Sequence, residues 1–123
     1  MLNRRQKFGQ HAEAEAIQFL KAIGYQILAR NYRTKMGEID VIAKEKDTIV
    51  FIEVKARHSY SFGHPKFAVT AKKRKKISMA ALFYLKATSQ INCKARFDVV
   101  AITAKSTQPQ IEIIRNAFEL AYR

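Results

Sequence analysis

Three side chains within sixteen residues of this sequence could do chemistry together. Twelve residues separate Asp40 from Glu53, and Lys55 follows two positions after Glu53. Both acids fall in segments rich in β-branched residues, so a tight hairpin would place the two carboxylates side by side, with Lys55 on the same face as Glu53. Paired carboxylates raise each other's pKa unless a cation lies between them, and such oxygen ligands suit Mg²⁺ or Mn²⁺.

A divalent ion at this place would polarise a phosphodiester oxygen and lower the pKa of a water molecule. Lys55 would then orient the attacking water or balance the charge that develops on phosphorus. The alternative is a surface ion network of Asp40, Glu53 and Lys55, in which each pair contributes ~1 kcal/mol or less to stability. The spacing of the three residues leaves both interpretations open.

The charge of the chain is uneven as well as large. The net charge is +13, which favours a polyanionic partner. Half of the ten acidic residues lie in 36–57, whereas 58–96 contain nine basic residues and no acidic one. This distribution indicates either a cation site within a phosphate-attracting surface, or a solvated acidic hairpin beside a solvated basic helix.

The apolar pattern predicts a single α/β domain over residues 1–123, with a mixed sheet flanked by helices. The expected elements are a helix over 4–23, strands over 25–33, 39–44 and 48–57, a loop over 58–69, a helix over 71–87 capped by Thr70, strands over 96–103 and 111–114, and a helical turn over 118–123.

The first predicted helix carries two acids. Glu13 and Glu15 lie on opposite flanks of its apolar stripe, so either could reach the border between core and solvent. The helical wheel does not choose between them.

The second predicted helix begins with five consecutive basic residues, which is unusual because cations at a helix amino terminus oppose the macrodipole. Bound phosphate would compensate. Lys73 lies on the same side as Ile77, so its stem should run toward the sheet, where either a phosphate contact or simple snorkelling of the ammonium would follow. The residues expected to contact nucleic acid are Arg57, Lys72, Lys73, Arg74, Lys75 and Lys76.

Two further features bear on partners. Met79, Leu82 and Phe83 form a second apolar face of this helix, which a homodimer contact or the 58–69 loop would cover. Asp98, in the strand over 96–103, is expected to satisfy an arginine or backbone groups rather than to bind metal.

Several classes of protein are disfavoured. One cysteine, Cys93, cannot form an internal disulfide, and the three histidines lack metal-ligand spacing. The longest apolar run, 79–85, is far below the ~20 residues that cross a bilayer, and the amino terminus does not resemble a secretory signal. We therefore expect a cytoplasmic protein without a membrane partner.

The ordered series Gly37-Glu38-Ile39-Asp40, then VFIEVK over 50–55, Phe62-Gly63, Val69 with Lys73, and RFDVV over 96–100 resembles the YraN-type UPF0102 family, from about residue 8 to residue 118. That family belongs to the PD-(D/E)XK nuclease superfamily, which includes restriction endonucleases and archaeal Holliday junction resolvases. The resemblance implies an αβββαβ restriction-endonuclease-like core.

Carried over residue by residue, the resemblance implies that Asp40 and Glu53 are metal ligands, that the carbonyl of Val54 is a third oxygen ligand, and that Lys55 is the motif lysine. It also implies that Glu13 is the first-helix glutamate, which reaches the metal directly or through water. Glu15 would then be a solvated flank residue. Two positions depart from the superfamily pattern: Ile39 stands for the proline before the motif aspartate, and Ala12 for the glycine before the helix glutamate.

The expected function is a Mg²⁺-dependent endonuclease acting on DNA, with Mn²⁺ as a substitute and with structure preferred over sequence because a small domain leaves little room for base readout. Two alternatives remain at this point: a nucleic-acid-binding protein of the same fold that does not cleave, and an interaction protein whose basic helix docks on RNA or on an acidic partner.

Overall fold

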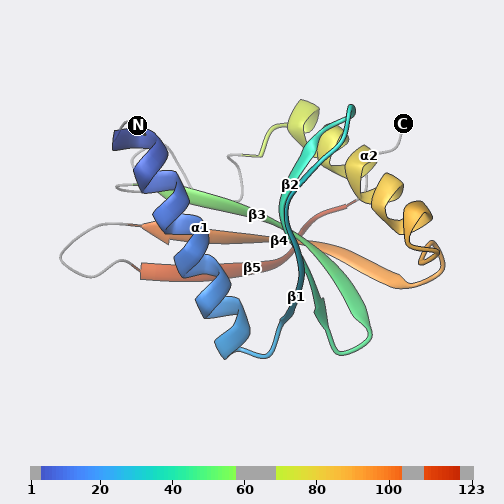
Figure 1. The fold of residues 1–123 in the computed structure, drawn as a ribbon, viewed down its shortest axis with the longest axis horizontal. Coiled ribbons are helices and arrows are strands. Elements are labelled where there is room, and N and C mark those ends of the chain that lie inside the picture. The colour runs from blue at the N-terminus through green and yellow to red at the C-terminus, as the bar shows by residue number, and fades with distance from the viewer. Residues whose placement is uncertain (1–3, 58–68, 104–109, 120–123) are drawn as a thin grey trace.

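A five-stranded sheet forms the centre of the computed structural model (Figure 1). The structure describes residues 4–57, 69–103 and 110–119, with side chains from residue 11 onward. In chain order the elements are α1 (Arg4–Ala22), β1 (Gln26–Arg33), β2 (Glu38–Glu45), β3 (Thr48–Arg57), α2 (Ala71–Ala87), β4 (Lys94–Thr103) and β5 (Gln110–Phe118).

The strands lie in the sheet in the order β1-β2-β3-β4-β5. β1, β2 and β3 form an antiparallel meander, α2 crosses over to β4, which pairs with β3 in parallel, and β5 returns antiparallel to β4. This mixed sheet with two helices confirms the predicted α/β class and is consistent with the restriction-endonuclease-like fold. β3 and β4 are internal strands, and their buried residues are mainly apolar on both faces, with Glu53 and Asp98 as charged exceptions.

The two helices cover opposite faces of the sheet (Figure 1). Leu20 of α1 packs in one core with Val50 and Ile52, whereas α2 packs in a second core with Phe51. Side chains alternate along a strand, so Glu53 follows Phe51 onto the α2 face. The strand period therefore fixes which helix can reach this carboxylate.

The end of α1 and the start of α2 each have a local cause. α1 gives way to Gly24, whose φ of 100° only glycine adopts readily, and the Tyr25 N–H then donates to the Leu20 carbonyl at 2.9 Å. α2 begins after Thr70, whose Oγ1 accepts the Lys73 N–H at 3.1 Å. The predicted cap at Thr70 is confirmed. No helix within the described ranges is long and apolar enough to span a bilayer.

The carboxyl-terminal prediction is wrong in part. The strand expected over 111–114 runs from Gln110 to Phe118, and Phe118 therefore does not start a helical turn. Its ring stacks on Phe97 of β4 at a centroid distance of 4.7 Å, and this apolar contact keeps the chain extended. Residues 120–123 and the loop predicted over 58–69, except for Val69, lie outside the described residues.

A buried polar network ties the sheet together. Asp98 has no exposed surface, and its carboxylate accepts hydrogen bonds from the Tyr25 hydroxyl at 2.9 Å, from Arg96 Nε at 3.0 Å and from the backbone N–H of Asn116 at 2.9 Å. Arg96 also donates to Glu45 of β2 at 2.7 Å. The prediction that Asp98 satisfies an arginine and the backbone is confirmed.

Asp98→Ala should lower the free energy of unfolding by about 3 kcal/mol, because it leaves buried donors without their acceptor. Urea denaturation measures the change. Asp47→Ala is the matched control, since Asp47 pairs with Lys94 at 3.3 Å on the open surface and should change stability little. Equal losses in the two variants would contradict a structural role specific to Asp98.

Candidate active site

The two strands that carry Asp40 and Glu53 separate at these residues. The pairing of β2 with β3 runs from Glu45 opposite Thr48 to Val41 opposite Ile52, and Asp40 and Glu53 would form the next pair. Instead, Asp40 Oδ2 accepts the backbone N–H of Val54 at 2.8 Å. The carboxylate thus takes the place of a strand carbonyl, and it is fixed between the two strands beside Glu53.

Glu53 is a buried carboxylate with two ammonium groups around it. Its side chain is 7% exposed, and its Oε1 lies 2.5 Å from Lys73 Nζ and 3.6 Å from Lys55 Nζ. Lys55 lies two residues further along β3 on the same face, as predicted, and Lys73 reaches in from the first turn of α2. A buried carboxylate requires such cationic partners because desolvation strongly disfavours an isolated charge.

Among the described residues, no cation pairs with Asp40 as Lys73 pairs with Glu53. Burial raises the pKa of its carboxyl group to about 7, with help from the nearby negative charges of Glu53 and Glu13, and the Val54 hydrogen bond and the Lys73 charge offset this only in part. The lysines of the site therefore do not fully balance the negative charge of Asp40. A divalent cation between the two carboxylates would remove this imbalance.

The two lysines respond differently to the same surroundings. Burial and the neighbouring Lys73 ammonium lower the pKa of Lys55. For Lys73, burial is the largest influence and acts to lower the pKa, but the hydrogen bonds to Glu53 and Lys55 and the negative charges of Glu53 and Asp40 together outweigh it, so the net shift is upward. Lys55 is therefore the more easily deprotonated of the two, and Lys73 stays charged in its ion pair with Glu53.

The structure separates the two glutamates that the helical wheel left open. Glu13 is half-buried, and its charge raises the pKa of Asp40. Glu15 instead forms an ion pair with His11 Nε2 at 2.8 Å. Glu13 is thus the α1 acid whose charge acts on Asp40.

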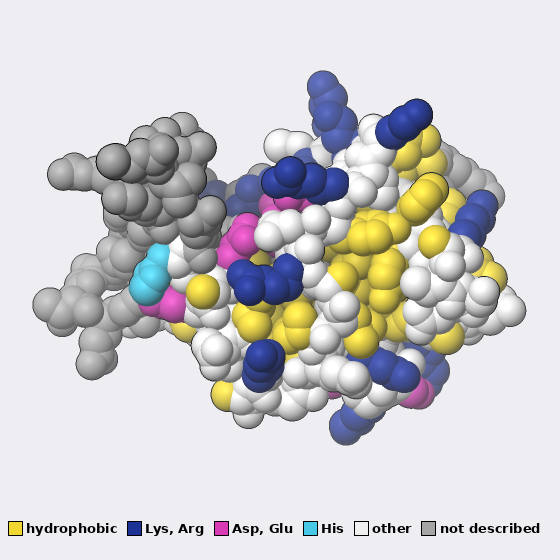
Figure 2. Space-filling model, viewed as in Figure 1, with side chains coloured by type: hydrophobic (Ala, Val, Ile, Leu, Met, Phe, Trp, Pro, Cys, Tyr) yellow, Lys and Arg dark blue, Asp and Glu magenta, His cyan; other side chains and the backbone are white. Residues whose placement is uncertain are grey.

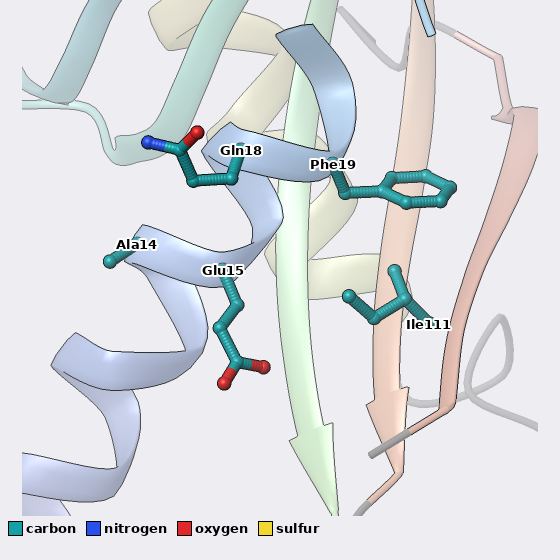
Figure 3. Close-up of a pocket in the computed structure, with 5 residues that line it drawn as sticks. All are labelled: Ala14, Glu15, Gln18, Phe19 and Ile111. Carbon is teal, nitrogen blue, oxygen red and sulfur yellow. The ribbon is translucent and has the colours of Figure 1, made fainter. Parts of the chain in front are cut away.

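A shallow hollow lies on the other flank of α1, against β5. Figure 3 shows the Phe19 ring approaching Ile111 across it, with Glu15 beside them. Its lining is Ala14, Glu15, Gln18, Phe19 and Ile111. Among its described lining residues, this hollow has one carboxylate, which is already paired with His11, and no lysine.

The oxygen donors fit a Mg²⁺ ion with a small protein ligand set. Asp40 and Glu53 supply carboxylates, and the Val54 carbonyl points to the same side of β3 as the N–H that Asp40 accepts, because both groups of one strand residue face the same neighbour. Within the described ranges, no three His, Cys, Asp or Glu side chains converge on one point. Mg²⁺ commonly takes one or two protein carboxylates and keeps its waters, so two carboxylates suffice.

The five consecutive basic residues at the start of α2 differ in their exposure to solvent. Lys72, Lys75 and Lys76 are exposed, as expected, whereas Lys73 turns into the site. Arg74 is half-buried, and its Nε is buried and has no hydrogen-bond partner among the described residues, so it is less open to solvent than its neighbours; its expected contact with nucleic acid stays a prediction.

The cause of the inward position of Arg74 is the helix period. Ser78 follows one turn later, is fully buried, and donates its hydroxyl to the Arg74 carbonyl at 2.7 Å. Arg57, the remaining predicted contact, is the half-buried last residue of β3, where it lies beside Thr103 of β4.

Sequence reasoning placed Lys73 among the phosphate contacts and missed its pairing with Glu53. The signal was available in part, since Ile77 and Ala80, on the same side of the helix as Lys73, are buried. Which strand residue the ammonium would meet depends on how α2 crosses the sheet, and local periodicity does not contain that information.

Residues 12–102 match the family described as "Uncharacterised protein family UPF0102". The chain is 51% identical over 119 residues to a UPF0102 protein of Desulfosudis oleivorans, covering 97% of this chain and 95% of that protein. It is 49% identical over 114 residues to a UPF0102 protein of Geobacter metallireducens, covering 93% of each chain.

Asp40→Asn should raise the free energy of unfolding at about pH 8 in a chelating buffer. The folded-state pKa is about 7 and the ordinary value 3.8, so stability falls as pH rises from about 4 to about 7 and stays low above it. Asn has no charge and can still accept the Val54 N–H, so it should recover a few kcal/mol, at ~1.4 kcal/mol per pKa unit. Urea denaturation at the two pH values measures the gap, which should close near pH 4.

The matched control is Glu45→Gln. The hydrogen bond from Arg96 is the main cause of the lowered pKa of Glu45, so this variant should lose stability at about pH 8. An Asp40→Asn protein that is less stable than the wild type at that pH would mean that the fold favours the Asp40 carboxylate, contrary to its surroundings.

Proposed function

The chain belongs to the UPF0102 family, and we propose that it is a metal-dependent endonuclease that hydrolyses phosphodiester bonds of DNA. The observation that carries this proposal is a half-buried acid, Asp40, beside a buried acid, Glu53, where β2 and β3 separate. Glu53 pairs with two lysines, Lys55 and Lys73. The lysines leave Asp40 with a pKa of about 7, so the donor set calls for a further cation.

In this proposal Asp40, Glu53 and the Val54 carbonyl hold Mg²⁺, or Mn²⁺ in its place. The ion supplies Lewis acidity at a phosphodiester oxygen and lowers the pKa of a water molecule. Glu13 contributes negative charge from the α1 side, and because it does not converge with the other two carboxylates, its action on the ion would run through water.

Lys55 and Lys73 have separate tasks. The lowered pKa of Lys55 suits a group that orients the attacking water and exchanges a proton with it. Lys73 remains charged, and its long stem allows the ammonium to leave Glu53 for a phosphate oxygen. The exposed Lys72, Lys75 and Lys76 hold the neighbouring phosphates.

Mg²⁺ should stabilise the wild-type protein and should fail to stabilise Glu53→Gln. At a concentration about ten times the dissociation constant, binding to the folded state alone adds ~1.4 kcal/mol to the free energy of unfolding. Thermal denaturation with Mg²⁺ and with chelator measures the difference. Glu15→Gln is the matched control and should keep the full effect. An equal Mg²⁺ effect in the Glu53 and Glu15 variants would remove this carboxylate from the metal site.

The purified protein should cleave DNA with Mg²⁺ or Mn²⁺ and be inactive with chelator. Plasmid, single-stranded, flap and four-way-junction substrates are compared by gel electrophoresis. Asp40→Asn and Lys55→Gln should each lower the rate by about 10²-fold or more, because each removes a group that acts on the reacting atoms.

Binding separates this function from its alternatives. Lys55→Gln should still bind DNA, because the exposed lysines of α2 are intact. Activity that survives both Asp40→Asn and Lys55→Gln would belong to a contaminant. Absence of cleavage on every substrate, with binding intact, would establish a non-cleaving binder of this fold.

A further inference from the structure

A line of surface hollows leads from the site along α2. The first hollow is formed by Thr70, Lys72, Lys73 and Lys76, and so begins at the lysine that pairs with Glu53. The next two follow it: Lys72 and Lys76 also line the second, with Lys75, Met36 and Met79, and Met36 also lines the third, with Arg33, Thr34, Lys35 and Phe83. Shared residues make the three hollows one continuous track.

Helix periodicity produces one side of this track. Lys72, Lys76, Met79 and Phe83 recur at intervals of four, three and four residues, which places them in one stripe of about 16 Å along α2. The stripe is basic near the site and apolar away from it. Lys75 lies beside it and is exposed.

The turn between β1 and β2 forms the other side. A Cβ at Gly37 would lie 2.6 Å from the Lys76 carbonyl, so only glycine lets the turn pack directly on the α2 backbone. The Thr34 hydroxyl holds the turn closed by accepting the N–H groups of Met36 and Gly37. Met36 is thereby fixed over the stripe.

Apolar side chains are open to solvent along this track. Phe83 is 56% exposed and Met36 is 52% exposed. Figure 2 shows hydrophobic surface with Lys and Arg side chains at the upper right, the side on which α2 and the β1–β2 turn lie in Figure 1. None of the described residues that line the three hollows is acidic; Glu38 lies nearby as the partner of Arg33, at 3.4 Å.

We propose that this track binds a single-stranded segment of nucleic acid whose phosphates contact the lysines and whose bases rest on Met36, Met79 and Phe83. The inference rests on the proposed function, to which it adds the substrate class: DNA with an unpaired segment next to the cleaved bond. Paired bases are hidden inside a duplex and would leave these apolar side chains without a contact, whereas unpaired bases stack on them.

Two other occupants of this track, a second copy of the chain and an acidic peptide, fit it less well. A second copy of this chain would bring Lys35, Lys72, Lys75 and Lys76 against cations of the same kind, which costs free energy. An acidic peptide would satisfy the lysines, but it would not use the continuity of the track with Glu53, Lys55 and Lys73.

Phe83→Ala should weaken binding of a labelled oligothymidine about tenfold, as expected for the loss of one stacked base, and should leave binding of a blunt duplex of equal length unchanged. Fluorescence anisotropy with the full chain in chelator measures both without cleavage. Ile91→Ala is the matched control, because Ile91 is 48% exposed but lies outside the track, and it should change neither.

The phosphate contacts have their own readout. Lys76→Gln should reduce the slope of log affinity for oligothymidine against log salt by about 0.7, the value for one phosphate contact on a single strand. Lys44→Gln, an exposed lysine near the β2–β3 turn, should leave the slope unchanged.

Three results would overturn this inference: equal loss of duplex and single-strand binding in Phe83→Ala, competition by polyglutamate as effective as that by oligothymidine, and a dimer in solution that Phe83→Ala dissociates. None of these results tests the proposed nuclease activity, which is contradicted instead if metal-dependent cleavage is absent. Single-strand binding that depends on Phe83 in a protein that does not cleave would leave the track in place and remove the nuclease.

Discussion

The close placement of two carboxylates, one buried and one half-buried, is the constraint on which the rest of the site depends. Asp40 and Glu53 lie where β2 and β3 stop pairing, and the described part of the chain supplies one backbone N–H and two ammonium groups against their charge. The hydrophobic cores on both faces of the sheet provide the free energy that holds this unfavourable arrangement together. The raised pKa of Asp40 measures how incomplete the compensation is.

The opposite end of the same strands shows what full compensation looks like. Near the start of β3 and β4, Asp98 and Glu45 share the guanidinium of Arg96, which Arg115 assists, and the pKa of Glu45 is lowered. At one end of the sheet, two arginines thus hydrogen-bond two acids. At the other end both lysines pair with Glu53, and within the described residues Asp40 has no ion pair. Perturbed carboxylates of the second kind are typical of functional sites, whereas matched pairs of the first kind stabilise the fold.

Most of the fold could be predicted from local patterns in the sequence. Alternation along β3 placed Glu53 and Lys55 on one face, and the residue types around Thr70 gave the helix start, because both features depend on neighbours within a few positions. The contact of Lys73 with Glu53 and the choice of Glu13 over Glu15 depend on where each helix crosses the sheet. The length of β5 depends on Phe118 meeting Phe97. Such tertiary contacts override local propensity, and the helical turn predicted at Phe118 was wrong for that reason.

In the proposed function, the charges of the site would couple binding of the metal ion to binding of the nucleic acid. A polyanion is attracted by the net charge of +13 and by the lysines of α2, yet it meets two carboxylates at the end of this surface. Without a cation, these carboxylates repel the phosphate that comes nearest to them. In the proposed function, a divalent ion would neutralise the two carboxylates, and Lys73 could then turn from Glu53 to a phosphate of the nucleic acid. Metal binding and placement of the strand would therefore favour each other, since each would relieve a repulsion that the other would otherwise meet.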